Sequence, residues 1–132
     1  MSEKKRSILI IDDDRSSLMA LTDILHPDYE LYLEIDSAEA IMTAENCIPD
    51  IILLDILMPG PDGYDVISKL KASEKTKNIP VIFITGLEST DLEEKGFALG
   101  AVEFISKPFH QAVVKMRIHH QITILDLGGY KL

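Results

Sequence analysis

The sequence predicts an α/β domain in which one parallel sheet is covered by helices on both faces. Short apolar runs alternate along the chain with longer segments whose apolar residues recur at helical spacing, as in repeated strand–helix units. The short runs lack the polar alternation of a strand with one wet face, which indicates burial on both faces. A length of 132 residues with 46% hydrophobic and 27% charged residues suits one domain with one core.

Five apolar runs are the predicted strands. They are ILII (8–11), YELYLEI (29–35), IILL (51–54), VIFI (81–84) and VEFI (102–105). Because a helical segment separates each run from the next, we expect the strands to be parallel and joined by helical crossovers.

Five helices are predicted between and after these strands. The first is marked by three leucines on one face, Leu18, Leu21 and Leu25. The second is expected to begin at Ser37 as its N-cap, with Ile41 and Ala44 facing inward. The third, residues 64–71, buries Val66, Ile67 and Leu70, and the fourth, residues 89–99, is the least apolar. The fifth begins near Phe109, and its apolar face consists of Val114, Ile118, Ile122 and Leu125.

Charge and hydropathy exclude two classes of partner. The formal net charge of −9 opposes binding to nucleic acid phosphates and to anionic lipid, so we expect neither partner for this domain. No segment approaches the roughly 20 apolar residues that cross a bilayer, and the apolar run near the start stops at Asp12, too short for a signal peptide. The single cysteine, Cys47, is interpreted as a buried thiol in a helix, which suits a cytoplasmic location.

Polar residues stand at the carboxyl ends of four predicted strands. Asp12, Asp13 and Asp14 follow the first, Asp55 the third, Thr85 the fourth and Lys107 the fifth. In the strand order 2-1-3-4-5, the first and third strands are neighbours at the reversal point where ligands bind. We therefore expect all of these side chains to face one crevice.

Crowded carboxylates at neutral pH hold either protons or a cation. With oxygen ligands alone, the preferred ion is Mg²⁺, which takes one or two carboxylates and keeps open positions for phosphoryl oxygens. Asp55 could then act as a nucleophile toward phosphorus, with Lys107 and Thr85 compensating the phosphoryl charge.

Four motifs resemble the receiver domain of two-component response regulators, a CheY-like domain with the flavodoxin-like doubly wound fold. They are IIDDD (10–14), IILLDILMPGPDGYDV (51–66), VIFITG (81–86) and FISKPF (104–109). The similarity covers residues 6–125. It implies a phosphoacceptor signalling domain that catalyses only its own phosphorylation and dephosphorylation.

The resemblance implies roles for the acidic residues. Asp55 matches the aspartate that accepts a phosphoryl group from a sensor histidine kinase or phosphotransfer protein. Asp13 matches a direct Mg²⁺ ligand and Asp12 one that acts largely through water, while Leu57 stands where the family uses a backbone carbonyl as a ligand.

The resemblance also implies a switch. Thr85 matches the switch hydroxyl, Lys107 the ion-pairing lysine, and the Lys107–Pro108 peptide one that is cis in the family. Phe104 matches the aromatic switch residue, and its alternative interpretation is an ordinary core aromatic of the fifth strand.

Two pairs of loop residues carry further expectations. Leu57 and Leu87 stand where the family flanks the path of the attacking water; neither can orient water, which predicts slow self-dephosphorylation. Gly60 and Gly63 are expected to supply backbone with positive φ in the loop after Asp55.

The expected boundaries are 1–125 for the receiver domain and 126–132 for a tail or the start of a linker to an output domain. We expect that output domain in the same full-length chain, although a stand-alone receiver remains open. The family signals through the face of the fourth helix, fifth strand and fifth helix, by homodimerisation or by docking on a target.

Two other functions remain as alternatives. Asp12, Asp14 and Ser16 form a D-x-D-x-S that loosely resembles the haloacid dehalogenase phosphatases, with Asp12 as nucleophile, but this leaves Asp55 without a role. A receiver fold used only for interaction generally lacks one of the acidic or lysine residues, all of which are present here. The four histidines are interpreted as surface residues: His26, His110, His119 and His120.

Overall fold

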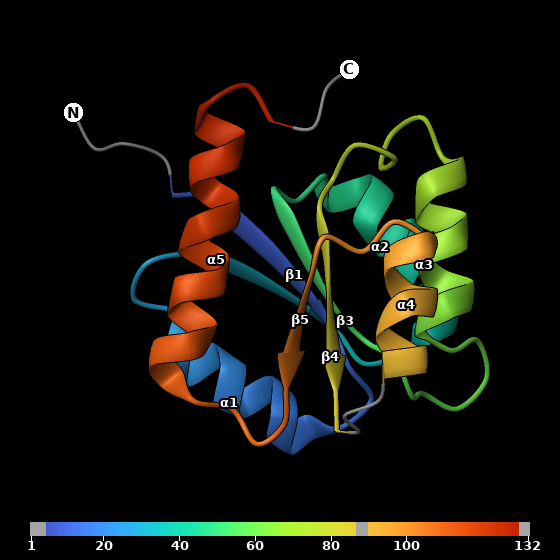
Figure 1. The fold of residues 1–132 in the computed structure, drawn as a ribbon, viewed down its shortest axis with the longest axis horizontal. Coiled ribbons are helices and arrows are strands. Elements are labelled where there is room, and N and C mark those ends of the chain that lie inside the picture. Colours follow the sequence, from blue (N-terminus) through green and yellow to red (C-terminus); the bar gives the residue numbers. More distant parts are fainter. Residues whose placement is uncertain (1–4, 87–89, 130–132) are drawn as a thin grey trace.

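The computed structural model describes residues 5–86 and 90–129 and consists of a five-stranded parallel sheet with helices on both faces (Figure 1). The strands are β1 (Ser7–Ile11), β2 (Glu30–Glu34), β3 (Ile51–Asp55), β4 (Val81–Thr85) and β5 (Glu103–Ser106). The helices are α1 (Arg15–Leu25), α2 (Ala40–Cys47), α3 (Gly63–Ala72), α4 (Thr90–Ala98) and α5 (Gln111–Asp126), with a 3-10 turn η1 (Ser37–Glu39) before α2. The order β2-β1-β3-β4-β5 confirms the predicted topology.

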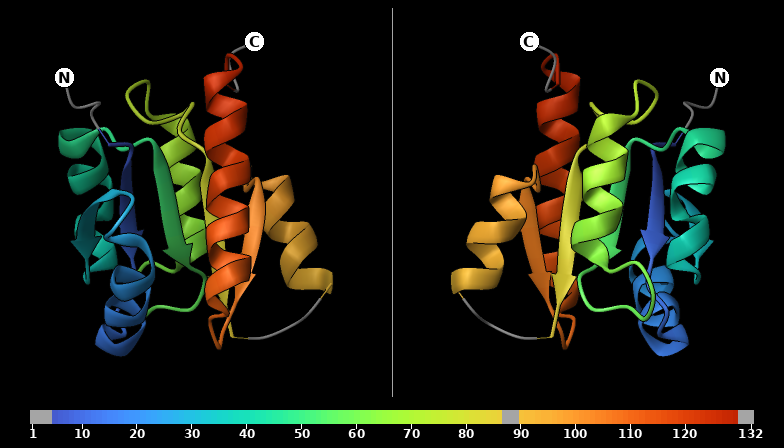
Figure 2. Two further views of the ribbon diagram at one scale, coloured as in Figure 1. Left: turned by 90° about the vertical axis from the view of Figure 1, so that its left-hand side faces the viewer. Right: turned by 90° about the vertical axis from the view of Figure 1, so that its right-hand side faces the viewer.

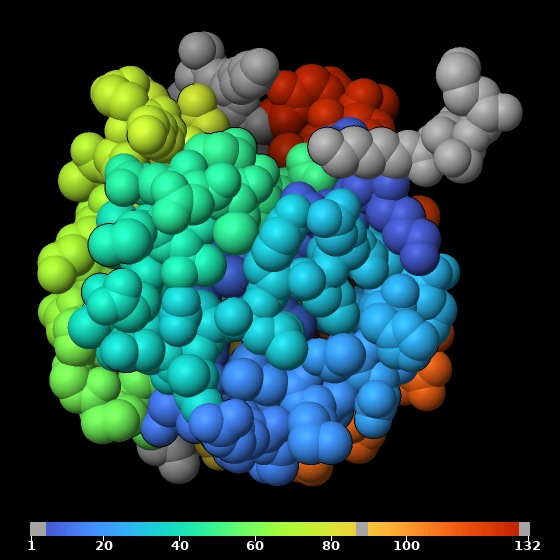
Figure 3. All heavy atoms as spheres, turned by 180° about the vertical axis from the view of Figure 1, so that it is seen from behind, coloured from blue at the N-terminus to red at the C-terminus, as the bar shows by residue number. Residues whose placement is uncertain are grey.

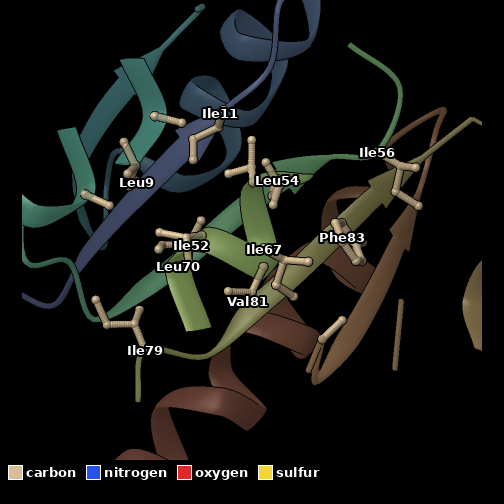
Figure 4. Packing of buried hydrophobic residues seen from close by; sticks show 14 of the residues in the cluster. Leu9, Ile11, Ile52, Leu54, Ile56, Ile67, Leu70, Ile79, Val81 and Phe83 are labelled. Carbon is tan, nitrogen blue, oxygen red and sulfur yellow. The ribbon is translucent and has the colours of Figure 1, made fainter. Parts of the chain in front are cut away.

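Two apolar layers lie on opposite sides of the sheet. Alternate strand residues enter them, so that Leu9 of β1 faces one layer and Ile10 the other. The helices α2 and α3 cover the first layer, and α1 and α5 cover the second (Figure 2). Figure 4 shows the first layer, in which Ile67 and Leu70 of α3 lie against residues of the central strands. Both central strands, β3 and β4, are fully buried, which explains their unbroken apolar sequences.

The edge strand β2 is less covered than its neighbours. Leu33 remains 49% exposed, whereas Ile10, its partner on β1, is completely buried. Figure 3 shows the molecule from behind the view of Figure 1, where α1, β2 and α2 lie over most of β1. The strand is also shorter than the predicted range of 29–35.

The prediction of Ser37 as the N-cap of the second helix is wrong, because a 3-10 turn precedes α2 and the N-cap of α2 is Glu39, which makes no side-chain cap hydrogen bond. Asp36 caps the η1 turn through its side chain, which accepts a hydrogen bond from the Ala38 N–H (2.9 Å). Ser37 is instead buried, and its hydroxyl donates to the carbonyl of Pro59 (3.2 Å). Both residue types cap helices well, so the sequence did not distinguish them.

The histidines, the cysteine and the start of the fourth helix were each the subject of a prediction. All four histidines are exposed, and Cys47, the last residue of α2, is half-buried with its pKa raised by burial. Across the described ranges, 5–86 and 90–129, none of the helices combines the length and apolar character that a membrane span requires. The predicted fourth helix begins at Ser89, which lies outside these ranges, and α4 is described from Thr90.

Candidate functional site

Three carboxylates meet at the carboxyl edge of the sheet, where all five strands end. Asp12 and Asp13 directly follow β1, and Asp55 is the last residue of the neighbouring strand β3. One carboxylate oxygen of each lies within 4.8 Å of the others. Asp12 is completely buried and Asp55 is 5% exposed, while Asp13 is open to solvent. The predicted convergence of these three residues is therefore confirmed.

Lys107 provides the positive charge at this cluster. Its Nζ lies 3.4 Å from Asp12 Oδ2 and 3.6 Å from Asp55 Oδ2. Its backbone N–H donates to the carbonyl of Thr85 (2.8 Å), which ties the residue to the end of β4. The Lys107–Pro108 peptide is cis, as the resemblance implied.

The surroundings of Asp55 oppose its ionisation. Burial, followed by the charge of Asp12, raises the pKa of Asp55 from 3.8 to about 7. Lys107 and the Leu57 N–H, which donates to Asp55 Oδ1 (3.3 Å), act in the opposite direction. The site is thus short of positive charge, and an added cation would favour the carboxylate form of Asp55.

The donor atoms fit Mg²⁺. Asp12 Oδ2 is buried and, among the described residues, has no partner in hydrogen-bonding geometry, although Lys107 is near enough for an ion pair. Together with Asp13, which is exposed to solvent, and Asp55 it forms a set of oxygen ligands alone, and this ligand chemistry suits Mg²⁺. The backbone carbonyl of Leu57 as a further ligand remains a prediction.

Asp14 does not join the cluster, and the expectation that it faces the crevice is wrong. It is the N-cap of α1, and its carboxylate accepts hydrogen bonds from the Ser16 N–H (2.9 Å), the Ser16 hydroxyl (2.7 Å) and the Ser17 hydroxyl (3.2 Å). These donors hold the pKa of Asp14 below its usual range. An aspartate directly before a helix is a capping signal, which could have revealed this role in the sequence.

Thr85 and Phe104 line one groove beside the acidic cluster. The groove has a volume of about 440 Å³ and extends to Arg117 of α5. Thr85 ends β4 and is 5% exposed, and Phe104 of β5 is 8% exposed. The Phe104 ring packs on Phe97 of α4, with centroids 5.0 Å apart, so one side of it lies against a surface helix. The switch roles of Thr85 and Phe104 remain predictions.

Leu57 and Leu87 were predicted to flank the path of water. The Leu57 side chain is 57% exposed in the loop after Asp55, a position consistent with partial shielding of the acceptor. Leu87 lies outside the described residues.

The loop after Asp55 uses its two glycines differently. Gly60 has φ +74°, as expected, but Gly63 does not have positive φ. A Cβ at Gly63 would lie 2.5 Å from the carbonyl oxygen of Asp55 and 2.7 Å from Cα of Ile56. Gly63 is therefore required by the close approach of α3 to the acceptor strand, and its predicted reason is wrong.

Tyr64 has a role that sequence reasoning missed. Its hydroxyl donates to the carbonyl of Leu92 in α4 (3.1 Å), and Lys95 Nζ lies 4.3 Å from its ring centroid. These contacts join α3 to α4. Residues 28 and 31 positions apart meet here only through the fold, so no local pattern indicated the contact.

Comparison with known proteins agrees with the geometry. The response regulator receiver domain family matches residues 8–119. The response regulator PleD of Caulobacter vibrioides is 37% identical over 112 residues, which make up 84% of this chain and 25% of PleD. A probable cyclic di-GMP phosphodiesterase of Vibrio cholerae is 35% identical over 113 residues, 86% of this chain and 26% of that protein. The chain thus spans about a quarter of the length of both relatives.

Solved structures share the same fold. The receiver domain of sensor histidine kinase PA1611 from Pseudomonas aeruginosa, which has a magnesium ion coordinated in its active site cleft, superposes with a TM-score of 0.81 at 25% identity and covers 88% of this chain and 96% of its own. A CheY-like receiver domain protein from Methanospirillum hungatei, at 24% identity, has a TM-score of 0.87 and covers 96% of this chain and 100% of its own. With the family match spanning most of the chain and the acidic triad in place, the protein belongs to the response regulator receiver domain family and is a phosphoacceptor signalling module.

Proposed function

We propose that Asp55 accepts a phosphoryl group from the phosphohistidine of a sensor histidine kinase or phosphotransfer protein. The observation that supports this most directly is the placement of Asp55, which is buried at a strand end and shares the Lys107 ammonium with Asp12. A carboxylate held in this way can attack phosphorus without a general base, since it has no proton to lose once ionised.

In the transfer, an Asp55 oxygen attacks phosphorus and forms the acyl phosphate O–P bond. The P–N bond to histidine breaks, its electron pair returns to the imidazole nitrogen, and that nitrogen takes up a proton. The transferring group carries negative charge on its three outer oxygens, so alignment and compensating positive charge supply most of the catalysis.

Lys107 and Thr85 are proposed to receive two of those oxygens. Lys107 already pairs with Asp55 at 3.6 Å, and phosphorylation gives its ammonium a more highly charged partner. Thr85 ends the strand next to β3, and its hydroxyl is the proposed hydrogen-bond donor to a second phosphoryl oxygen. Movement of Thr85 would alter the groove that it shares with Phe104, through which the signal would reach α4 and α5.

Magnesium is the proposed cofactor. Asp13 and Asp55 would hold it directly, Asp12 largely through water, and the Leu57 carbonyl would complete the protein ligands. When bound, the ion supplies positive charge that favours ionised Asp55 and offsets the charge of the phosphoryl oxygens.

The proposed output is the face formed by α4, β5 and α5, which would dimerise or dock on an output domain. Much of the length of PleD and of the phosphodiesterase lies outside the matched part, which supports an output domain in the same full-length chain here. We place the protein in the cytoplasm, because a lone Cys47 provides no internal disulfide.

The test is incubation with acetyl phosphate and Mg²⁺, followed by mass measurement of the intact protein. Wild type should gain one phosphoryl mass, Asp55→Asn should gain none, and the control Asp23→Asn, at an exposed aspartate of α1, should behave as wild type. Phosphorylation of Asp55→Asn would overturn the assignment. Modification of Asp12 instead would favour the hydrolase alternative.

A further inference from the structure

We infer that Asp14 is a positioning residue for the metal site, because it fixes the orientation of the Asp12 carboxylate from outside the cluster. The inference deepens the proposed function and rests on it. Asp14 is not proposed as a ligand of the ion; it acts through its backbone N–H and through the helix that it caps.

The first step is the contact between the two residues. The backbone N–H of Asp14 donates to Asp12 Oδ1 at 2.9 Å. That bond occupies one Asp12 oxygen and leaves the other, Oδ2, on the side of Lys107 and the cluster. Oδ2 is buried and has no hydrogen-bond partner among the described residues, and the Lys107 ammonium lies 3.4 Å from it, so the hydrogen bond at Oδ1 is the shorter of the two contacts that orient the carboxylate.

The second step is what holds the Asp14 N–H in place. The Asp14 carboxylate accepts three hydrogen bonds from the first turn of α1. The Asp14 backbone is extended, with φ −89° and ψ 110°. One of these donors, Ser17, is 6% exposed. Leu18 and Leu21 of the same helix are buried in the apolar layer that α1 and α5 cover, and they hold this first turn in place. A continuous chain of contacts therefore runs from the core through α1 and Asp14 to Asp12.

The third step is the consequence for the ion. Partners that orient metal ligands from outside the coordination shell typically change metal affinity by about 10- to 100-fold when removed. Asp13 is exposed, whereas Asp12 is completely buried, so Asp12 is the acid whose orientation the fold can set in advance. A carboxylate oriented before binding loses less side-chain freedom when the ion or its water arrives.

If Asp14 were only a helix cap, its replacement would lower stability and leave Mg²⁺ affinity unchanged. The test therefore measures Mg²⁺ affinity and stability separately. We would measure the Mg²⁺ dissociation constant by isothermal titration and, without metal, the urea midpoint of unfolding. Asp14→Ala should weaken Mg²⁺ binding by about 10-fold, the lower end of that range, because Asp12 reaches the ion largely through water. Asp14→Asn, which keeps an acceptor for the Ser16 N–H, should restore most of the affinity. The matched control Asp36→Ala removes the cap of η1 and should lower the urea midpoint without changing Mg²⁺ affinity.

A second variant covers the case in which Asp14→Ala does not fold. Replacing Ser16 and Ser17 together by alanine removes two of the three bonds to Asp14 while raising helix propensity in α1. Mg²⁺ affinity should still fall severalfold. Unchanged affinity in both Asp14→Ala and the serine double variant, or an equal loss in Asp36→Ala, would overturn the inference. Failure of wild type itself to bind Mg²⁺ would overturn the proposed function together with it.

Discussion

Asp55 must be ionised to accept phosphorus, yet its surroundings favour the protonated form. This conflict follows from its position, since a strand end that is buried enough to exclude water also desolvates the carboxylate, and Asp12 adds a like charge. Acceptor chemistry and stability of the metal-free protein therefore make opposite demands on one residue.

The conflict predicts that Asp55→Asn stabilises the metal-free protein in a pH-dependent way. The folded pKa of Asp55 is about 7 against 3.8 for the free side chain, so between these values the folded state binds more protons than the unfolded state. Stability therefore falls as pH rises from about 4 to about 7, and asparagine removes that loss. We expect a gain of about 1–2 kcal/mol in the free energy of unfolding at pH 8, and little gain at pH 4.5, measured by urea denaturation with EDTA.

The control for this measurement is Asp23→Asn, which changes the same charge at an exposed position. It should leave the free energy of unfolding unchanged at both pH values. A gain for Asp55→Asn that is equal at pH 8 and pH 4.5, or a loss at pH 8, would contradict the assigned pKa direction.

Leu57 is expected to lengthen the life of the phosphorylated state. Its side chain is next to the acceptor loop and offers water no hydrogen bond. We expect Leu57→Asn to shorten the half-life of the acyl phosphate severalfold after removal of acetyl phosphate, followed by intact mass. Leu57→Ala separates orientation from shielding, because it opens the space without adding a polar group; equal half-lives in all three proteins would refute both.

At the scale of elements, the strands were predictable throughout, since both ends of each strand lie within one residue of the predicted range. β3 and β4 match their predicted ranges to within one residue, because strands covered on both faces have continuous apolar sequences. The residues that cap helices and turns were less predictable. Asp14 and Asp36 both lie at helix or turn starts, and whether such an aspartate caps a helix or points into a crevice depends on neighbours brought near by the fold.

In the site, too, contacts that depend on the packing of the fold were not predictable from the sequence. Asp12, Asp13, Asp55 and Lys107 were predictable because parallel strands end at one edge, so chain topology alone places them together. The contacts of Tyr64 with α4 depend on how two helices pack, which no local sequence pattern records.

Gly63 determines how closely α3 approaches the acceptor strand. A Cβ there would meet backbone atoms at 2.5 and 2.7 Å, which cannot move as a flexible side chain would. We expect Gly63→Ala to lower the free energy of unfolding by about 2–4 kcal/mol, measured by urea denaturation. The matched control is Gly86→Ala, where a Cβ would have no atom of the described residues within 4 Å apart from its chain neighbours. A loss of similar size at both glycines would contradict the steric explanation.

Tyr64 is expected to restrain α4. Tyr64→Phe keeps the ring contact with Phe83, whose centroid is 5.7 Å away, but removes the hydroxyl that donates to Leu92. We expect faster amide hydrogen exchange in residues 90–98 and a loss of about 1 kcal/mol in the free energy of unfolding. Tyr29→Phe, on the α1 side of the sheet, should leave exchange in α4 unchanged. Unaltered α4 exchange in Tyr64→Phe would contradict the restraint.

At the scale of the whole molecule, one arginine joins both ends of the described chain. Arg6, just before β1, pairs with Asp50 at 3.1 Å and also with Asp126, the last residue of α5. Both partners are carboxylates, and they raise the pKa of Arg6. These partly exposed pairs link the end of α5 to the amino edge of the sheet, opposite the acidic cluster.

The exposed surface of α4 and α5 predicts dimerisation on phosphorylation. Val113 and Met116 of α5 and Phe97 of α4 are apolar side chains that are 38%, 58% and 49% exposed on this surface, and Phe97 lines the same groove as Thr85. Repacking of the groove on phosphorylation would change this surface, and two copies could bury it against each other. We expect beryllofluoride with Mg²⁺ to convert the monomer to a dimer in sedimentation velocity, and Met116→Glu to prevent this while still accepting phosphorus at Asp55. Met42→Glu is the matched control, since Met42 is 59% exposed on α2 at the other end of the sheet, and should dimerise as wild type does. A dimer that persists in Met116→Glu would move the interface elsewhere, and a wild-type monomer under beryllofluoride would leave docking on an output domain as the function of this face.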